Sequence, residues 1–375
     1  MAARGACRNG APEAVRWEAR QSVSTDDVAE KVRFLSSPAA YDPEPTRVTV
    51  KETHMSWVFL TEARVYKLKK PLHEPHLDFR SLAARERNCR EEVRLNRRLA
   101  PDIYLGVVAL THNAEGQLEL GGDGTVVDWL VEMRRLPQAR MLDHLLIAGK
   151  ANRQHVLKVV ELLARFYPAQ HAVSISPADY VQQFRREQAI NADMLTAERF
   201  ALPRRPLTDV LKRVDRMLTD GFPLLAERVD EKRIIDGHGD LRPEHVCLIA
   251  TPAIIDCLEF SSDLRRLDPY DEIAFLGLEC ALLGAPWVGP LLLDRLKPIL
   301  GPVHDEVLEF YWAYRACLRA RQAVAHLDDH APRSPEKWRP LALAYIALAD
   351  AGLARTLEKV SDGALAKRTA DRFGK

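Results

Sequence analysis

The feature that most constrains the fold of this chain is a change of sequence pattern near residue 133. Before this point, short segments rich in β-branched and aromatic residues predict antiparallel strands over 47–52, 54–61, 64–71, 104–110, 117–120 and 125–133. One prominent helix is expected among them, over 81–100, because its apolar residues follow a helical stripe that stops before Pro101. After residue 133, amphipathic helical patterns dominate, interrupted by one predicted hairpin whose apolar runs, 245–250 and 253–258, flank Thr251 and Pro252. The sequence therefore predicts an α+β protein with a β-rich first part and a larger helical second part.

This pattern divides the 375 residues into three predicted stretches: a flexible tail at 1–25, a first lobe at 26–133 and a second lobe at 134–375. The tail carries arginines but lacks the apolar segment of a secretory signal. The six cysteines form no C-x-x-C pair and no cluster with histidine. These features predict reduced thiols in a cytoplasmic protein.

The charge balance narrows the class of partner. The chain has 54 lysines and arginines and 53 aspartates and glutamates, and this near-neutral balance gives no reason to expect a nucleic-acid partner. No apolar run approaches the roughly 20 residues that cross a bilayer, so no membrane partner is expected. The ligand must therefore be inferred from a site.

The predicted hairpin carries the strongest candidate for such a site. His238, Gly239 and Asp240 lie in a polar stretch just before it, and Asp256 ends its second strand, 16 residues after Asp240. A two-stranded return brings both carboxylates to one end of the hairpin, where they suit a base and a metal ligand. A site of metal-dependent hydrolysis built from His238, Asp240, His245 and Asp256 is an alternative at this point.

The stretch around Asp240 and Asp256 closely resembles the catalytic loop and metal-binding segment of the aminoglycoside phosphotransferase and choline kinase superfamily. The resemblance implies a two-lobed protein-kinase-like fold that binds ATP and magnesium and moves the γ-phosphoryl group to a hydroxyl of a small-molecule acceptor. It implies that Asp240 is the catalytic base, which orients the acceptor hydroxyl and accepts its proton, with His238 supporting the loop, and that Asp256 binds the metal. Asp271 is similar to the aspartate at a helix start that braces the backbone of the catalytic loop in these kinases.

His245 departs from the superfamily pattern, which has an asparagine metal ligand five residues after the catalytic aspartate. Because magnesium prefers oxygen ligands, a histidine nitrogen at this position weakens the second metal or favours manganese. Glu259 is a candidate replacement carboxylate, and a strand-end residue facing solvent is the alternative reading. A catalytically degenerate, ATP-binding pseudokinase with a regulatory role therefore remains the alternative function.

The first lobe contains a basic strand, 64–71, that resembles the strand bearing the phosphate-binding lysine. Lys67 is preferred over Lys69 because Val65, its neighbour on the same face, can cover an adenine ring. Glu92 on the following helix is similar to the glutamate that pairs with this lysine, and Glu91 is its competitor. The hydrolase reading leaves Lys67, Glu92 and the two-lobe pattern unexplained.

The remaining nucleotide contacts are expected from two other segments of the first lobe. The turn over 51–57 contains no glycine, and its Thr53 and Ser56 hydroxyls are candidate phosphate donors. The strand over 125–133 resembles the hinge between lobes, whose backbone near Glu132 and Met133 would contact adenine. The whole arrangement resembles an uncharacterised bacterial subgroup of aminoglycoside-phosphotransferase-like proteins, some of which are fused to a P-loop kinase-like domain. This sequence contains no Walker A motif, so it predicts no such second domain here.

Overall fold

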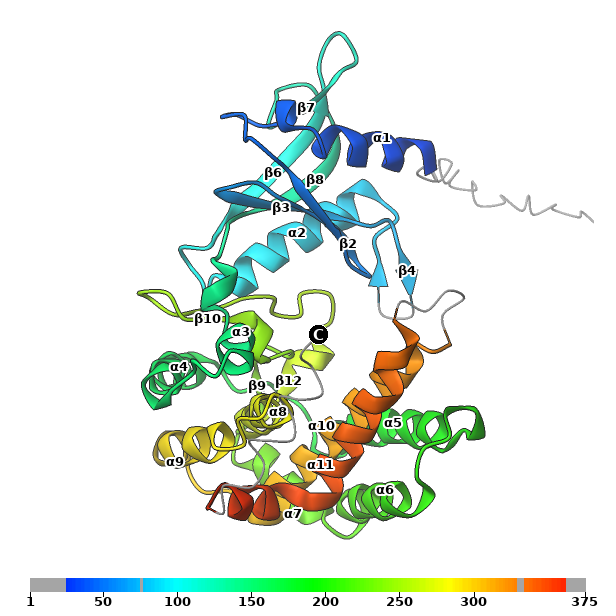
Figure 1. Ribbon diagram of the computed structural model, residues 1–375, viewed down its shortest axis with the longest axis vertical. Coiled ribbons are helices and arrows are strands. Elements are labelled where there is room, and N and C mark those ends of the chain that lie inside the picture. Colours follow the sequence, from blue (N-terminus) through cyan, green and yellow to red (C-terminus); the bar gives the residue numbers. More distant parts are fainter. Residues whose placement is uncertain (1–24, 75–76, 329–333, 362–375) are drawn as a thin grey trace, which may run out of the picture.

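The computed structural model describes residues 25–74, 77–328 and 334–361. Almost all of the predicted tail, residues 1–25, lies outside this range. Figure 1 shows a sheet with two helices at one end of the molecule and a mainly helical part at the other. The α+β, two-lobed architecture predicted from the sequence is confirmed.

The first lobe is built on an antiparallel six-stranded sheet in the order β1-β2-β3-β8-β6-β7. Its strands are β1 (Thr49–Glu52), β2 (Ser56–Leu60), β3 (Arg64–Lys69), β6 (Tyr104–His112), β7 (Leu118–Leu120) and β8 (Thr125–Arg134). A small hairpin adds β4 (His73–Glu74) and β5 (Leu77–Asp78), and the lobe's helices are α1 (Thr25–Leu35) and α2 (Leu82–Asn96). The predicted strands and the predicted helix correspond to six of these strands and to α2, with ends that differ by a few residues.

Two apolar clusters hold the first lobe together. One joins α1 to one region of the sheet through Leu35, Tyr41, Phe59, Tyr66, Leu68, Leu110 and Leu130. The other joins α2 to β6 and β8 through Cys89, Val93, Tyr104, Val131 and Met133, and it includes Ala253 from the second lobe. The two lobes therefore share an apolar contact beside the hairpin that precedes Asp256.

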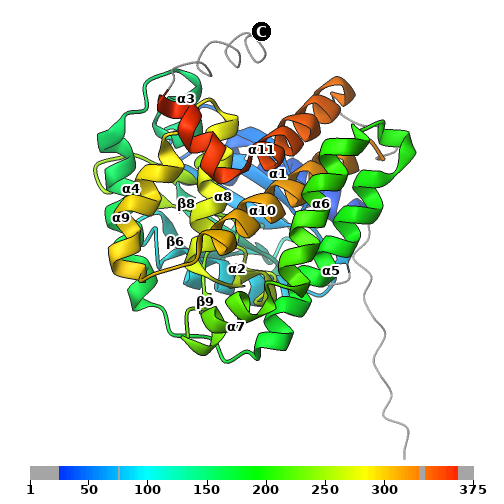
Figure 2. The ribbon, with the colours of Figure 1, turned by 90° about the horizontal axis from the view of Figure 1, so that it is seen from below.

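Helices form most of the second lobe, as Figure 2 shows from below. They are α3 (Leu142–Ile147), α4 (Arg153–Phe166), α5 (Pro177–Thr196), α6 (Arg204–Thr219), α7 (Phe222–Asp230), α8 (Pro269–Leu282), α9 (Val288–Leu300), α10 (Asp305–Ala325) and α11 (Pro335–Ser361). Two short pairs of strands interrupt them: β9 (Ile235–Asp236) with β12 (Arg266–Leu267), and β10 (Val246–Cys247) with β11 (Ala253–Ile254). The second pair is the predicted hairpin, shorter than expected.

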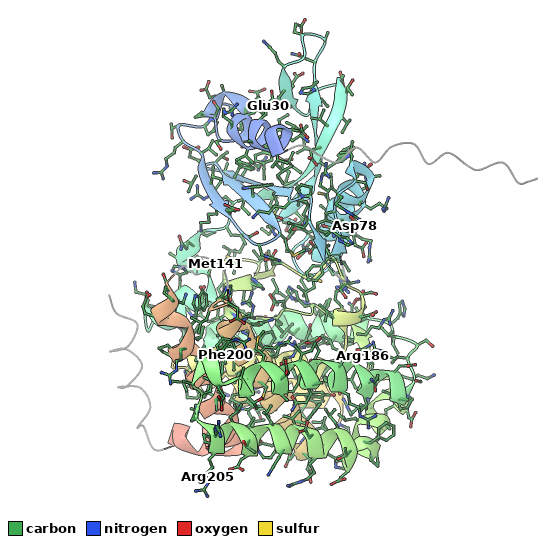
Figure 3. All side chains as sticks on the ribbon, turned by 90° about the vertical axis from the view of Figure 1, so that its right-hand side faces the viewer. Glu30, Asp78, Met141, Arg186, Phe200 and Arg205 are labelled. Atoms are coloured by element: carbon green, nitrogen blue, oxygen red, sulfur yellow. The ribbon has the colours of Figure 1, made fainter. Side chains whose placement is uncertain are left out.

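One large apolar core packs α4, α5, α6, α8, α9, α10 and α11 around the nearly fully buried helix α8. Figure 3 shows side chains filling this lobe, with Met141 labelled near the junction with the sheet lobe and Arg205 near the opposite end. Within the described residues, no helix combines the length and apolar character that a membrane crossing needs. Figure 1 shows β10 close to the sheet lobe and α8 deeper in the helical lobe.

Candidate active site

Lys67 and Glu92 meet inside the first lobe. Side chains alternate along β3, so Lys67 and Lys69 both face α2. Lys67 Nζ lies 2.9 Å from Glu92 Oε1, Lys69 also pairs with Glu92, and the Glu92 side chain is only 1% exposed. Glu91, the competing residue, instead forms an ion pair with Arg94 at the surface. The structure therefore brings together the preferred lysine and glutamate.

Asp256 reaches this pair from the second lobe. Its Oδ1 lies 2.5 Å from Lys67 Nζ, although the two residues are 189 positions apart. Burial disfavours the charge on Lys67, but the carboxylates of Asp256 and Glu92 raise its pKa well above the ordinary value. Burial likewise disfavours the charge on Asp256, and Lys67 and His245 lower the pKa of this carboxyl in spite of it. Both groups therefore stay ionised at neutral pH.

Asp240 lies in the loop before β10, beside Arg242 and His245. Arg242 Nη2 donates to Asp240 Oδ2 at 2.8 Å. Burial disfavours ionisation of Asp240, yet His245, Arg242 and His238 together lower its pKa. The Asp240 carboxylate is therefore a charged acceptor at neutral pH, suited to orienting a hydroxyl group.

The tautomer of His245 follows from its hydrogen bond to the loop. Nδ1 lies 2.8 Å from the backbone oxygen of Asp240, and a carbonyl oxygen only accepts, so Nδ1 carries the hydrogen. In a neutral ring, Nε2 then keeps its lone pair, which accepts from Arg242 Nη2 at 3.4 Å and lies 3.5 Å from Asp256 Oδ2. His245 thus presents a nitrogen lone pair beside the Asp256 carboxylate.

His238 is buried and tied to the backbone on both sides of its ring. Nε2 donates to the backbone oxygen of Ile255 at 2.9 Å, and Nδ1 accepts from the Asp240 N–H at 3.3 Å. Burial, with a smaller contribution from His245, lowers the pKa of His238 to about 4. His238 is therefore neutral at pH 7 and holds the Asp240 loop against the segment that carries Asp256.

The prediction that Asp271 braces this loop is wrong. Both Asp271 carboxylate oxygens bind Arg315, at 2.7 and 2.6 Å, inside the helical core. Glu272 Oε1 instead accepts the backbone N–H groups of His238 and Gly239, each at 2.6 Å. Consecutive residues in the first turn of α8 point about 100° apart, so only one of them can face the loop.

The backbone of Glu132 and Met133 does not fit the predicted adenine contact. Both residues lie within β8, paired with Tyr66 and Val65 of β3 on one side and with β6 on the other. Both hydrogen-bonding edges of this backbone therefore face neighbouring strands. An adenine contact is better sought beyond the end of β8 at Arg134.

The Thr53 hydroxyl is also engaged. It donates to the backbone oxygen of Ser56 and accepts from the Ser56 N–H, each at 3.0 Å, in the turn between β1 and β2. Ser56 itself is 5% exposed. The Thr53 hydroxyl, which was predicted to bind phosphate, therefore stabilises the turn. To bind phosphate it would have to give up one of its two hydrogen bonds to Ser56.

Three buried or half-buried arginines of the second lobe bind acids of the same lobe. Arg265 Nε donates to Asp236 at 2.6 Å, and Arg319 Nε donates to Glu279 at 2.9 Å. Arg315 binds Asp271, as described above. These arginines stabilise the lobe through ion pairs.

The donor set fits a cation that is shared with phosphate oxygens. Among the described residues, no group of three or more His, Cys, Asp or Glu side chains is arranged to hold a metal ion. Magnesium in phosphoryl-transfer sites is commonly bound by one or two protein carboxylates together with substrate phosphates. Asp256 supplies one such carboxylate, with His245 Nε2 beside it. Glu259, the candidate replacement ligand, is bound to Lys69 at 2.6 Å.

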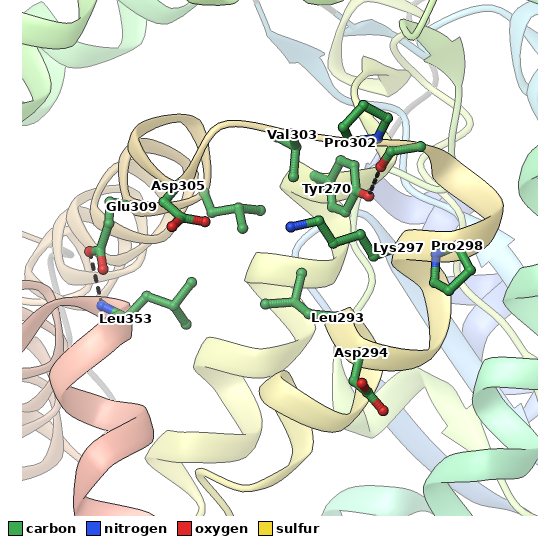
Figure 4. Close-up of a pocket in the computed structure, with 12 residues that line it drawn as sticks. Tyr270, Leu293, Asp294, Lys297, Pro298, Pro302, Val303, Asp305, Glu309 and Leu353 are labelled. Carbon is green, nitrogen blue, oxygen red and sulfur yellow. Dashed lines mark hydrogen bonds between the residues drawn. The ribbon is translucent and has the colours of Figure 1, made fainter.

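A separate pocket lies in the second lobe and contains none of these residues. Its volume is about 720 Å³, and its walls come from α8, α9, α10, α11 and the loop between α9 and α10. Figure 4 shows Lys297 extending between Val303 and Leu293 in this pocket. It is thus distinct from the site at the junction of the lobes.

Two comparisons of the sequence with known proteins gave one set of relatives and no family match. No protein-family model matches the chain. Uncharacterized proteins of Mycobacterium tuberculosis and Mycobacterium bovis are each 32% identical to it over 294 residues, covering 76% of this chain and 57% of theirs. The chain thus spans little more than half the length of these curated relatives.

Solved structures resemble the chain at low sequence identity. A choline/ethanolamine kinase family protein from Mesorhizobium loti has a TM-score of 0.52 at 14% identity, covering 89% of this chain and all of that one (100%). An aminoglycoside phosphotransferase solved with GDP and kanamycin has a TM-score of 0.48 at 13% identity, covering 81% of this chain and 92% of that one. The chain therefore shares the two-lobed fold of the choline/ethanolamine kinase family protein.

Proposed function

We propose that this protein is an ATP-dependent phosphotransferase that moves the γ-phosphoryl group of the nucleotide to a hydroxyl of a small molecule. The observation that carries the proposal is the meeting of Lys67, Glu92 and Asp256 at the junction of the lobes. A strand, a helix and the segment that follows β11, from distant parts of the sequence, supply these side chains. In protein kinases, phosphoryl transfer needs a lysine paired with a glutamate and an aspartate that holds the metal, and these three side chains match that arrangement.

Each residue has a proposed task. Lys67, oriented by Glu92, binds nucleotide phosphate oxygens, and Asp240 orients the acceptor hydroxyl and takes its proton as the catalytic base. The hydroxyl oxygen forms a bond to the γ-phosphorus as the bond from that phosphorus to the ADP oxygen breaks, and ADP leaves. Asp256 and His245 would hold a divalent cation, which when bound neutralises charge on the phosphates. His238 and Glu272 keep the Asp240 loop fixed. Little covalent chemistry is asked of the protein, because positioning and charge neutralisation supply most of the catalysis.

His245 motivates an additional proposal about the metal. Its tautomer places the Nε2 lone pair beside Asp256, where a bound metal would replace the contact with Arg242, and an imidazole nitrogen suits manganese better than magnesium. We therefore expect manganese to support nucleotide binding at least as well as magnesium. The pseudokinase alternative shares the nucleotide site and differs only in the absence of transfer to an acceptor.

Calorimetric titration with ATP tests the proposal. Wild-type protein is titrated without metal, with magnesium and with manganese, beside an Asp256→Ala variant. We expect metal-dependent binding that the variant loses. Folded wild-type protein that binds no ATP under any of these conditions would refute both the kinase and the pseudokinase readings.

A second experiment separates these two readings. Purified protein is incubated with labelled ATP and a panel of hydroxyl acceptors, and the transfer of label is compared between wild type and Asp240→Asn. Transfer that is lost in Asp240→Asn supports the enzyme. Binding of ATP with no transfer to any acceptor would favour the pseudokinase.

A further inference from the structure

The segment that carries Asp256 is hydrogen bonded to the first lobe through its backbone. The N–H of Asp256 donates to the Tyr104 hydroxyl oxygen at 3.1 Å, and the N–H of Cys257 donates to Asn96 Oδ1 at 2.9 Å. Asn96 and Tyr104 are 1% and 0% exposed. Two successive amides of a second-lobe segment thus end on buried side chains of α2 and β6.

The flanking amides of the same segment are held by the Asp240 loop. The N–H of Ile255 donates to the backbone oxygen of His245 at 2.9 Å, and the N–H of Leu258 donates to that of His238 at 3.1 Å. The segment over 255–258 is therefore fixed by one lobe at its two ends and by the other lobe in its middle.

Asp256 needs such support because of its backbone conformation. Its φ is +66°, in the left-handed region that residues other than glycine seldom occupy. Such a conformation persists only where the surrounding contacts impose it. The contacts from Tyr104 and Asn96 fall on this residue and on the next one, so they are placed to impose it.

Asn96 also connects the segment to the Lys67–Glu92 pair. It lies one helical turn after Glu92 on α2, and its Nδ2 donates to the backbone oxygen of Glu92 at 2.9 Å. The Asn96 side chain thus bonds its own helix with its amide nitrogen and the metal-binding segment with its oxygen. A movement of α2 that displaced Glu92 would also pull Asn96 from Cys257.

A buried ion pair adds a second connection across the junction. Lys69 Nζ lies 2.6 Å from Glu259 Oε1, and the two side chains are 3% and 10% exposed. Glu259 follows Asp256 by three residues, and Lys69 follows Lys67 by two on the same face of β3. The basic face of β3 therefore meets the segment at two points.

We propose that Asn96 is a positioning residue that fixes Asp256 against the first lobe, so that the metal-binding carboxylate and the Lys67–Glu92 pair are assembled together. Lys69 and Glu259 secure the same contact from the other end of the segment. The inference rests on the proposed function for its catalytic meaning. The two hydrogen bonds that hold the segment, from the N–H groups of Asp256 and Cys257 to Tyr104 and Asn96, form the clamp. Its strength can be measured without any nucleotide.

The test compares Asn96→Leu with Asn88→Leu, a matched change about two turns earlier on the same helix. Asn88 is also buried, at 7% exposure. Hydrogen exchange is followed by mass spectrometry for the peptide that contains residues 255–259, in protein without nucleotide. We expect exchange of this peptide to be about tenfold faster in Asn96→Leu, because the Cys257 N–H loses its acceptor, and unchanged in Asn88→Leu.

The second readout is the gain in ATP affinity that manganese or magnesium provides. Asn96→Leu should reduce this gain about tenfold while changing metal-free affinity by less than about twofold, since Lys67 and Glu92 remain. Glu259→Gln keeps the shape of the ion pair and should shift both readouts in the same direction, which covers the case in which Asn96→Leu does not fold.

The outcomes are distinct. Exchange in Asn96→Leu and Glu259→Gln that matches Asn88→Leu would overturn the clamp. Faster exchange with an undiminished metal-dependent gain would overturn the positioning role. If wild-type protein shows no metal-dependent gain, the proposed function fails, and the exchange measurement alone still decides whether Asn96 holds the segment.

Discussion

The contact between Glu272 and the Asp240 loop yields a prediction that can be worked out from the structure. Glu272 Oε1 accepts two backbone N–H groups at 2.6 Å, and Oε2 accepts the Tyr167 hydroxyl at 3.1 Å. All of these groups are buried. A Glu272→Ala substitution removes the acceptor of all three donors at once.

The expected cost follows from the donors left without a partner. Each buried N–H without an acceptor costs about 1–3 kcal/mol, and water entering the vacated space recovers part of that. We therefore expect Glu272→Ala to lower the free energy of unfolding by about 3 kcal/mol. Glu272→Gln keeps one acceptor oxygen for the loop but loses its charge, so about 1 kcal/mol is expected.

Urea denaturation followed by fluorescence and by circular dichroism gives the two free energies. A loss below about 1 kcal/mol in Glu272→Ala would refute the assigned role, because it would mean that the loop N–H groups do not depend on this carboxylate. Equal losses in the Ala and Gln variants would also refute it, since only the Gln side chain retains an acceptor.

Three further predictions concern the charged residues of the site. Because the pKa of His238 is about 4 in the folded protein and about 6.5 when unfolded, the unfolded chain binds the proton first as pH falls. Wild-type protein should therefore lose roughly 3 kcal/mol from this group between pH 6.5 and 4, and His238→Gln should lack that part of the loss in denaturation curves measured across this range. Lys67→Met should weaken ATP binding by at least about tenfold. The Lys70 ammonium pairs with Glu52 instead, so the control Lys70→Met should change ATP affinity by less than about twofold. Equal losses of affinity in the two variants, measured by calorimetry, would contradict the role of Lys67. His245→Asn should raise the ratio of magnesium-supported to manganese-supported ATP affinity, because an amide oxygen replaces a nitrogen, and an unchanged ratio would show that His245 does not contact the metal.

The sheet of the first lobe was predictable because its signals are local. Strand alternation put Lys67 and Lys69 on one face, and the helical stripe put Glu92 on the helix that follows. The choice of Glu92 over Glu91 rested on the family resemblance, and the structure shows how the two differ physically: the Glu92 side chain is 1% exposed and that of Glu91 is 35% exposed. The hairpin before Asp256 was likewise visible as two apolar runs around a turn.

The contacts between lobes were not predictable in the same way. Adjacent acids in the first turn of α8 are indistinguishable in sequence, although one faces Arg315 and the other faces the loop. Asn96 left one signal, a polar residue one turn after Glu92 on the buried face of a helix, but its acceptor role depends on the segment that packs there. The predicted adenine contact at Glu132 and Met133 failed for a similar reason. The pairing of β8 with β3 on one side and β6 on the other follows from the assembled sheet and cannot be read from β8 alone.

The direct contact between Lys67 and Asp256 has a consequence for how ligands enter the site. At 2.5 Å the Lys67 ammonium and the Asp256 carboxylate neutralise each other. In a metal–nucleotide complex, Lys67 is proposed to bind phosphate and Asp256 to bind the metal. A nucleotide without metal offers phosphates to Lys67 but brings added negative charge towards Asp256, Asp240 and Glu92, and like charges at close range repel. A divalent cation removes that conflict, because it gives Asp256 a new partner while Lys67 turns to phosphate. Strong metal dependence of nucleotide binding is thus expected from the charges of the site itself, whether or not the protein proceeds to transfer the phosphoryl group.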